Sequence, residues 1–216
     1  NSGASQNTPS LQTQSTGVEA NAYPLFYDVW NTTAKDGDYI YNSNGINWLF
    51  KRAAGFMDVV CFTGDGVNTN QRVSHNLTVA PELIIYKGRT RANYWRVYSG
   101  NITEYTVLNL NNAVATGFNF WGTSAPTATD FGFNPGAMDL DGFTAVAYLF
   151  ATVAGVSKVG SYTGTGADLN VDCGFTAGAR FILIKRTDST GDWYVYDSVR
   201  GIVAGNDPYL LLNSTA

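Results

Sequence analysis

The side chains that could do acid–base chemistry are few and widely separated. His75 is the only histidine in the chain, so a metal site built from several imidazoles is excluded, and a Ser-His-Asp arrangement would depend on this one residue. It lies in VSHNL (73–77), and the matching stretch VDCGF (171–175) carries Cys173 at the same position. Because cysteine stands there, we expect His75 to be a packing residue at the end of a strand.

Carboxylates occur in close pairs, and glycosidases work with two carboxylates about 5–10 Å apart. The pairs are Asp36 with Asp38, Asp139 with Asp141, and Asp168 with Asp172. Each pair stands near Gly or Asn, where aspartate commonly forms turns, so we expect turn formers and no catalytic residue. DLDG (139–142) resembles a fragment of a calcium loop, but the other ligands of an EF-hand are absent. Calcium bound by Asp139 and Asp141 in a lectin-like loop stays open, and we expect no other metal and no cofactor.

Three further features, the glycine-rich turns, the cysteines and the charge, limit the possible functions. The Thr-Gly-x-Gly turns at 63–66 and 163–166 lack a following helix and a Gly-Lys-Ser/Thr motif, so a nucleotide site is not expected. Cys61 and Cys173 are too few for a disulfide scaffold, and we expect two free, buried thiols. Charged residues are 14% of the chain and the net charge is −4. Nucleic acid is therefore not expected as a partner, because phosphate binding needs clustered Lys and Arg.

The elements that must position these residues are strands. The 13 Tyr, 12 Phe and 23 Gly, with abundant Val, Thr and Asn, are typical of an all-β protein with a polar but weakly charged surface. LIIYK (83–87) and FILIK (181–185) fit the middle of a packed sheet. The longest apolar run, residues 144–156, is too short to span a membrane and fits a core strand. Short strands without capped helical periodicity predict an antiparallel β-sandwich.

The chain also repeats itself at an offset near 100 residues. The hairpin APELIIYKGRTRANYWRVYSG (80–100) matches ARFILIKRTDSTGDWYVYDSVRG (179–201), so that Lys87, Trp95 and Tyr98 correspond to Lys185, Trp193 and Tyr196 at an offset of 98. Further matches join 48–56 with 148–156 and 55–66 with 155–166 at an offset of 100, and 108–113 with 210–216 at about 102.

These matches predict four segments. They are a polar arm or linker at 1–22, the end of a preceding unit at 23–54, a complete sandwich unit at 55–154, and a second, incomplete unit at 155–216. The second unit has no counterpart of residues 118–151 and would expose sheet edges and half a core. We expect its missing strands to come from further chain or from a neighbouring subunit.

Aromatic side chains gather around the repeated hairpins. Flat rings beside amides and hydroxyls suit sugars, and we expect five of them to form a receptor-binding surface: Tyr94, Tyr98, Trp121, Tyr194 and Tyr196. Trp95 and Trp193 recur at equivalent positions and are expected to be core anchors. In WYVYD (193–197), strand alternation places Tyr194 and Tyr196 on the opposite face from Trp193.

The motifs KRAxGFxDVV, APxLIIxK and FILIKRTDSxGDWYVYD, within residues 48–216, resemble a repeat domain of tail-fibre and related appendage proteins of phages, notably marine and cyanobacterial phages. The resemblance implies a jelly-roll or concanavalin-like β-sandwich repeated along a long virion protein, with no catalytic motif. It implies an extracellular, non-enzymatic adhesive role, with other tail subunits and a host-surface glycan or protein as partners, and a homo-oligomer such as a trimer. Two alternatives stay open: a glycan depolymerase, which needs two acids in one groove, and a secreted cellular lectin-like or fibre subunit.

Overall fold

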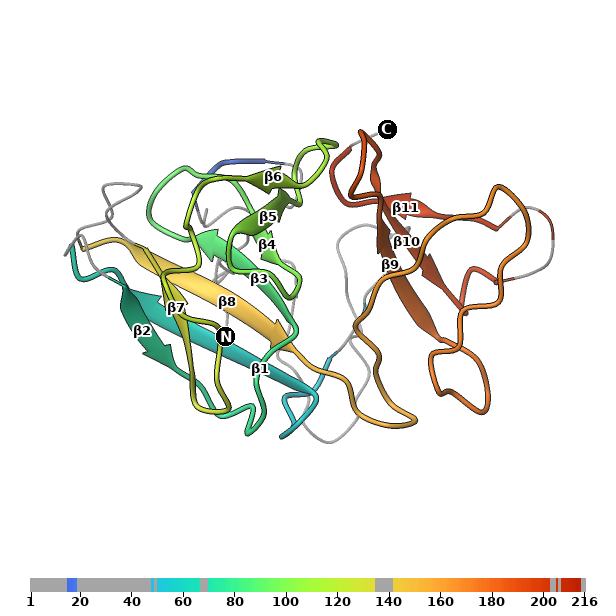
Figure 1. Ribbon diagram of the computed structural model, residues 1–216, viewed down its shortest axis with the longest axis horizontal. Helices are drawn as coiled ribbons and strands as arrows, with labels where there is room; N and C mark the ends of the chain where they lie inside the picture. Colours follow the sequence, from blue (N-terminus) through green and yellow to red (C-terminus); the bar gives the residue numbers. More distant parts are fainter. Residues whose placement is uncertain are drawn as a thin grey trace, which may run out of the picture.

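The computed structural model describes residues 15–18, 48, 50–66, 70–134, 142–202, 205 and 207–214. Within them the regular elements are strands (Figure 1): β1 (Met57–Thr63), β2 (Gln71–Ser74), β3 (Leu83–Gly88), β4 (Arg96–Tyr98), β5 (Glu104–Val107), β6 (Ala115–Thr116), β7 (Asp130–Phe133), β8 (Thr144–Phe150), β9 (Phe181–Lys185), β10 (Trp193–Asp197) and β11 (Leu210–Leu211). The described part of the chain contains no helix, and so none that could cross a membrane. The predicted all-β class is confirmed.

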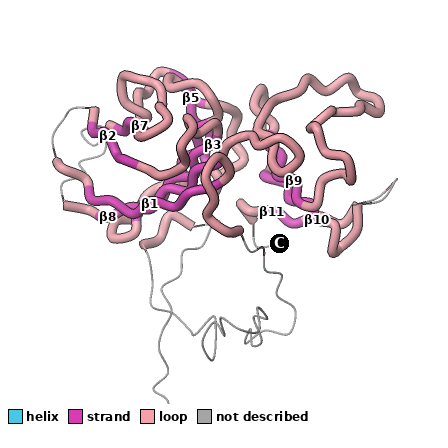
Figure 2. The backbone as a smooth tube through the Cα atoms, turned by 90° about the horizontal axis from the view of Figure 1, so that it is seen from below, coloured by secondary structure: helices cyan, strands magenta, loops and turns pink. Residues whose placement is uncertain are grey.

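Every strand pair is antiparallel. One sheet has the order β1-β8-β3-β4-β5-β6, a second consists of β2 and β7, and a third has the order β11-β10-β9. The first two sheets form one lobe, and β9–β11 lie beside it as a C-terminal lobe (Figure 2). The longest apolar run of the sequence is a core strand, as expected, since β8 pairs with β1 on one edge and β3 on the other.

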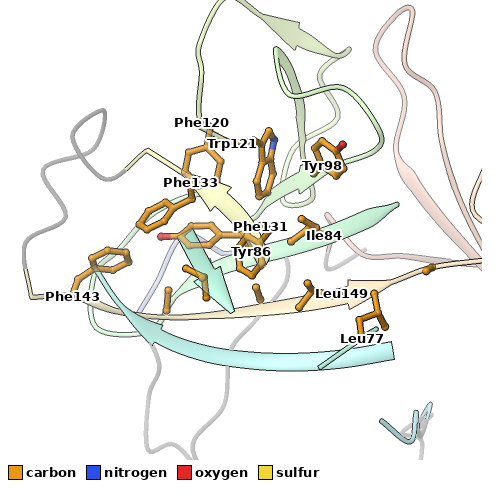
Figure 3. Close-up of a cluster of buried hydrophobic side chains, with 14 residues drawn as sticks. Leu77, Ile84, Tyr86, Tyr98, Phe120, Trp121, Phe131, Phe133, Phe143 and Leu149 are labelled. Atoms are coloured by element: carbon orange, nitrogen blue, oxygen red, sulfur yellow. The ribbon is translucent and has the colours of Figure 1, made fainter. Parts of the chain in front are cut away.

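The main core lies between the six-stranded sheet and the β2–β7 layer (Figure 3). Small side chains of β8, Ala145 and Ala147, leave room for large rings from the facing layer. Phe120 packs edge-on against Tyr86 and Trp121, with ring centroids 5.0 and 4.7 Å apart. Such edge-to-face pairs add to the burial of apolar area. Two packed antiparallel sheets with an aromatic core are consistent with the predicted β-sandwich.

A second, smaller core joins the two lobes. Val97 of β4 shares one buried cluster with Trp193 of β10, together with Trp95 and Leu108, which directly flank β4 and β5. Val97 points away from the main core, because its neighbour Tyr98 belongs to that core and successive residues of a strand point to opposite faces. The indole Nε1–H of Trp193 donates to the backbone oxygen of Val107 at 2.9 Å. The two tryptophans that the repeat makes equivalent are therefore parts of one interface between the lobes.

The two hairpins have corresponding hydrogen bonds. The backbone N–H of Trp95 donates to Asn109 Oδ1, and that of Trp193 donates to Asn213 Oδ1, both at 2.9 Å. These bonds make Asn109 and Asn213 structurally equivalent, at an offset of 104 residues. The sequence match suggested an offset of about 102 for this part of the chain. Two copies of one hairpin geometry are present, while a repeated unit of about 100 residues stays a prediction.

The lysine of each hairpin reinforces this likeness. Lys87 Nζ donates to the oxygen of Asn93 in its own hairpin at 2.8 Å and to Thr16 from the N-terminal segment at 2.9 Å. Lys185 Nζ donates to the oxygen of Gly191 at 2.8 Å and is 3.4 Å from that of Asn111 in the preceding lobe. In both hairpins a chain segment from outside supplies one of the carbonyl oxygens.

The hairpins differ in how far they are covered. β3 lies between β8 and β4 and is mostly buried, whereas β9 is an edge strand among the described strands and all its residues are half-buried. The expectation that residues 181–185 lie in the middle of a sheet does not hold for the described strands, because none of them takes the place of β8. Residues 158–178 form no strand and are largely exposed. Most of segments 1–22 and 23–54 lies outside the described residues.

Both cysteines are free, as predicted, but their predicted burial is wrong for Cys61. Cys61 is exposed on β1, while its neighbour Phe62 packs against the main core. Strand alternation therefore turns the thiol away from the core. Cys173 is half-buried.

Candidate functional site

Only one of the three predicted acid pairs, Asp168 with Asp172, lies among the described residues. Asp36, Asp38, Asp139 and Asp141 lie outside the described residues, so the calcium hypothesis stays untested. Asp168 and Asp172 stand in the exposed segment before β9. Asp172 Oδ1 accepts the backbone N–H of Gly174 at 2.8 Å, which is the local hydrogen bond of a turn former. Among the described residues, no three His, Cys, Asp or Glu side chains are grouped as metal ligands.

His75 is a packing residue directly after β2, as expected. Its ring is buried and stacks on Phe131, with centroids 6.5 Å apart. Nδ1 accepts the backbone N–H of Leu77 at 3.1 Å, so Nε2 carries the proton and donates to the oxygen of Thr127 at 3.2 Å. Burial lowers the pKa of His75 below its usual 6.5. The ring is therefore neutral at pH 7, and both of its nitrogens are engaged in hydrogen bonds within the fold.

Two of the five predicted receptor-binding rings are in the core. Tyr98 is 4% exposed and Trp121 is 1% exposed, with ring centroids 5.6 Å apart (Figure 3). Trp121 Nε1–H donates to the backbone oxygen of Glu104 at 3.1 Å. The expectation of a surface role is wrong for both, because they belong to the cluster that the β2–β7 layer covers. Tyr94 is 43% exposed on the connection between β3 and β4.

The other two predicted rings join a third, which the sequence did not single out. Tyr194 and Tyr196 of β10 are stacked with centroids 6.4 Å apart, and Tyr209 packs against them at 5.1 and 6.2 Å. We call these three residues the tyrosine face. Tyr209 is 52% exposed and directly precedes β11, where Leu210 pairs with Val195. This third strand could have been inferred by extending the hairpin match to residues 108–113 and 210–216.

The tyrosine face continues over an apolar part of β9. Ile184 lies opposite Tyr194, and Ile182 lies opposite Tyr196, so the four side chains point to the same side of the sheet. The corresponding side of β3 carries Ile84, which is fully buried beneath the β2–β7 layer. No described strand covers β9 and β10 in the same way. This side of the C-terminal sheet therefore remains half-buried where its counterpart is core.

The phenol of Tyr196 is neutral at physiological pH. Burial raises the pKa of Tyr196, and the neighbouring Tyr194 and Asp207 raise it further. A neutral phenol both donates and accepts hydrogen bonds. The surface can thus hold a ligand by ring contacts and hydroxyl hydrogen bonds.

The fold and this surface define an antiparallel β-sandwich protein with a half-open aromatic face on its C-terminal lobe. The chain belongs to the family described as domain of unknown function (DUF7483), whose model matches residues 15–215 and so spans both lobes. No curated protein and no solved structure matches the chain.

Proposed function

We propose that the chain is a non-enzymatic structural and adhesive component of a phage tail fibre or a related appendage, and that the tyrosine face binds a glycan on the host surface. The observation that carries this proposal is the grouping of Tyr194, Tyr196 and Tyr209 within 6.4 Å of one another on a half-open sheet. The likeness of the hairpin motifs to tail-fibre repeats supports the location on an extracellular virion structure.

A sugar matches the chemistry of this surface. One side of a pyranose ring presents C–H groups that pack on phenol rings, and its hydroxyls can exchange hydrogen bonds with Tyr hydroxyls. The apolar side chains of Ile182 and Ile184 extend the contact area on the same side of the sheet. Affinity for one glycan would be low, and a homotrimer within an assembled fibre would raise it through avidity.

Binding of host-surface polysaccharide tests the proposal. Purified chain is applied to immobilised lipopolysaccharide and capsular polysaccharide of a susceptible host, and binding is followed by biolayer interferometry. Tyr194→Ala and Tyr209→Ala are expected to weaken binding at least tenfold. Tyr94→Ala is the matched control, since this exposed ring has no ring contact with the tyrosine face and its loss should leave binding unchanged.

Other results would contradict parts of the proposal. If Tyr194→Ala, Tyr209→Ala and Tyr94→Ala all bound the polysaccharide as tightly as the wild type, the tyrosine face would be excluded as the site. Release of new reducing ends from the polysaccharide would identify a depolymerase instead. Immunogold labelling of intact virions tests the location, and unlabelled tails would favour a cellular lectin-like protein.

A further inference from the structure

One backbone oxygen of the N-terminal segment 15–18 is held by two donors of the first hairpin. The backbone N–H of Asn93 and Nζ of Lys87 both donate to the oxygen of Thr16 at 2.9 Å. Lys87 lies near the end of β3, and Asn93 lies in the loop that leads to β4. Thr16 comes 71 residues before Lys87 in the sequence. The segment 15–18 is therefore attached through its main chain to a distant hairpin.

The second hairpin holds a backbone oxygen of the first lobe with the same pair of donors. The backbone N–H of Gly191 donates to the oxygen of Asn111 at 2.8 Å, and Lys185 Nζ lies 3.4 Å from the same oxygen. Gly191 matches Asn93 at an offset of 98, which is also the offset between Lys185 and Lys87. The arrangement of a lysine and a loop N–H around one oxygen thus recurs at equivalent positions.

Thr16 and Asn111 therefore take the same place on their respective hairpins. The side chains of both residues are exposed, and their main-chain oxygens make the contacts. Donors that bind a main-chain oxygen place no demand on the side chain of the residue that supplies it. This explains why STG (15–17) and LNN (110–112) show no likeness in the sequence repeat although they take equivalent places.

Lys87 depends on the oxygen of Thr16 because its own side chain is fully buried. An ammonium group has three donors, and a buried donor without an acceptor costs free energy. Asn93 supplies acceptors from within the hairpin, its backbone oxygen at 2.8 Å and its Oδ1 at 3.4 Å, and Thr16 supplies one from outside it. The segment 15–18 thus completes the hydrogen bonding of the buried lysine, and the lysine in turn holds the segment.

We propose that the lysine and the loop N–H of each hairpin form a clamp for one main-chain oxygen of the preceding chain, and that the clamp of Lys87 and Asn93 makes residues 15–18 a docking strap on the first lobe. The equivalent clamp of the second hairpin connects the two lobes at Asn111. The chain that enters the first lobe is attached to it at Thr16 in the way that the lobes are attached to each other. This inference does not depend on which ligand the tyrosine face binds.

Amide hydrogen exchange in the full chain, followed by NMR, measures the two clamps separately. Lys87→Met keeps a long side chain and removes the ammonium group. The amide of Asn93 should exchange at least tenfold faster in this variant, while that of Gly191 exchanges as in the wild type. Lys185→Met is the matched control and should accelerate Gly191 alone, by a smaller factor because Lys185 is farther from its oxygen. Thr16→Ala should exchange like the wild type, because the clamp binds a main-chain oxygen.

A spin label gives a second readout, which a general loss of stability does not mimic. In a background with Cys61→Ser and Cys173→Ser, a nitroxide on Thr16→Cys should broaden the amide signal of Asn93. Adding Lys87→Met should remove most of this broadening while the amides of β8 keep their slow exchange.

Three results would each overturn the proposal. The first is an unbroadened Asn93 signal in the labelled chain that retains Lys87, a result that does not require any lysine variant to fold. The second is full broadening that persists in Lys87→Met. The third is equal acceleration of the Asn93 and Gly191 amides in Lys87→Met, which would show a general loosening of the fold and no separate clamp.

Discussion

Replacement of Trp193 tests whether the cluster between the lobes makes them one cooperative unit. Its ring is buried with Trp95 and Leu108, and its Nε1–H donates to the backbone oxygen of Val107 at 2.9 Å. Trp193→Phe keeps a ring in the cluster and removes the donor. Trp193→Ala removes the ring as well.

The expected costs follow from these contacts. The oxygen of Val107 also accepts the N–H of Leu110 at 3.2 Å, so Trp193→Phe leaves it with one partner, and the lost hydrogen bond costs about 1 kcal/mol. The smaller ring buries less apolar area and costs about 1 kcal/mol more. Trp193→Phe should therefore lower the free energy of unfolding by about 2 kcal/mol and Tm by roughly 4–8 °C. Trp193→Ala leaves a cavity and should cost about 3–5 kcal/mol.

Urea unfolding followed by far-UV and near-UV circular dichroism measures the free energy of unfolding of each variant, and a thermal scan gives Tm. The two signals should coincide for the wild-type chain and separate for Trp193→Ala, because the C-terminal lobe would unfold first. Trp48→Phe is the control, because it removes the hydrogen bond that the indole of Trp48 donates to Asp197. The carboxylate of Asp197 still accepts the backbone N–H groups of Val199 and Arg200 in this variant. The free energy of unfolding should therefore fall by less than about 1 kcal/mol. A loss under about 0.5 kcal/mol in Trp193→Ala would refute the reasoning.

Three further predictions concern titration and exposure. Burial lowers the pKa of Lys87 to about 8. Between pH 8 and about 10.5 the unfolded chain therefore binds more protons than the folded chain, and stability rises with pH. The free energy of unfolding of the wild type relative to Lys87→Met should increase by about 2 kcal/mol from pH 7.5 to 9.5. Urea unfolding of the wild type and Lys185→Met should show a smaller increase with pH, because Lys185 is only half-buried. Equal increases for the two lysines would contradict the role of burial. Burial lowers the pKa of His75, so stability should fall as pH drops below 6.5, and the single imidazole signal in an NMR titration should give a midpoint under that value; a midpoint above it would contradict the hydrogen bonds described. Nitration by tetranitromethane, mapped by mass spectrometry, should reach Tyr209 much faster than the fully buried Tyr86, and equally slow modification would show that the tyrosine face is covered.

The sequence predicts what depends on neighbouring residues. Alternation in WYVYD correctly separates the buried Trp193 and Val195 from the half-buried Tyr194 and Tyr196, because side-chain direction in a strand is a local property. The β-class follows from composition for a similar reason, since aromatic and β-branched residues fit a pleated surface.

Features that depend on strands far apart could not be predicted in this way. β8 inserts between β1 and β3, and no local pattern specifies that order. The same layer arrangement decides the fate of Tyr98 and Trp121. Their residue types suit a sugar-binding surface, but the packing of β2 and β7 over the six-stranded sheet makes them core.

The two hairpins differ in how far the rest of the chain covers them, and the proposed binding surface lies on the less covered one. Their internal hydrogen bonds correspond, including the bond from the tryptophan N–H to an asparagine side chain, so the same local sequence forms the same hairpin twice. What differs is the covering: Ile84 is fully buried, while its equivalent Ile182 is half-buried beside Tyr196. A side chain that is core in one copy is thus partly accessible in the other. Under the proposed function, the less covered hairpin is therefore the one expected to bind a ligand.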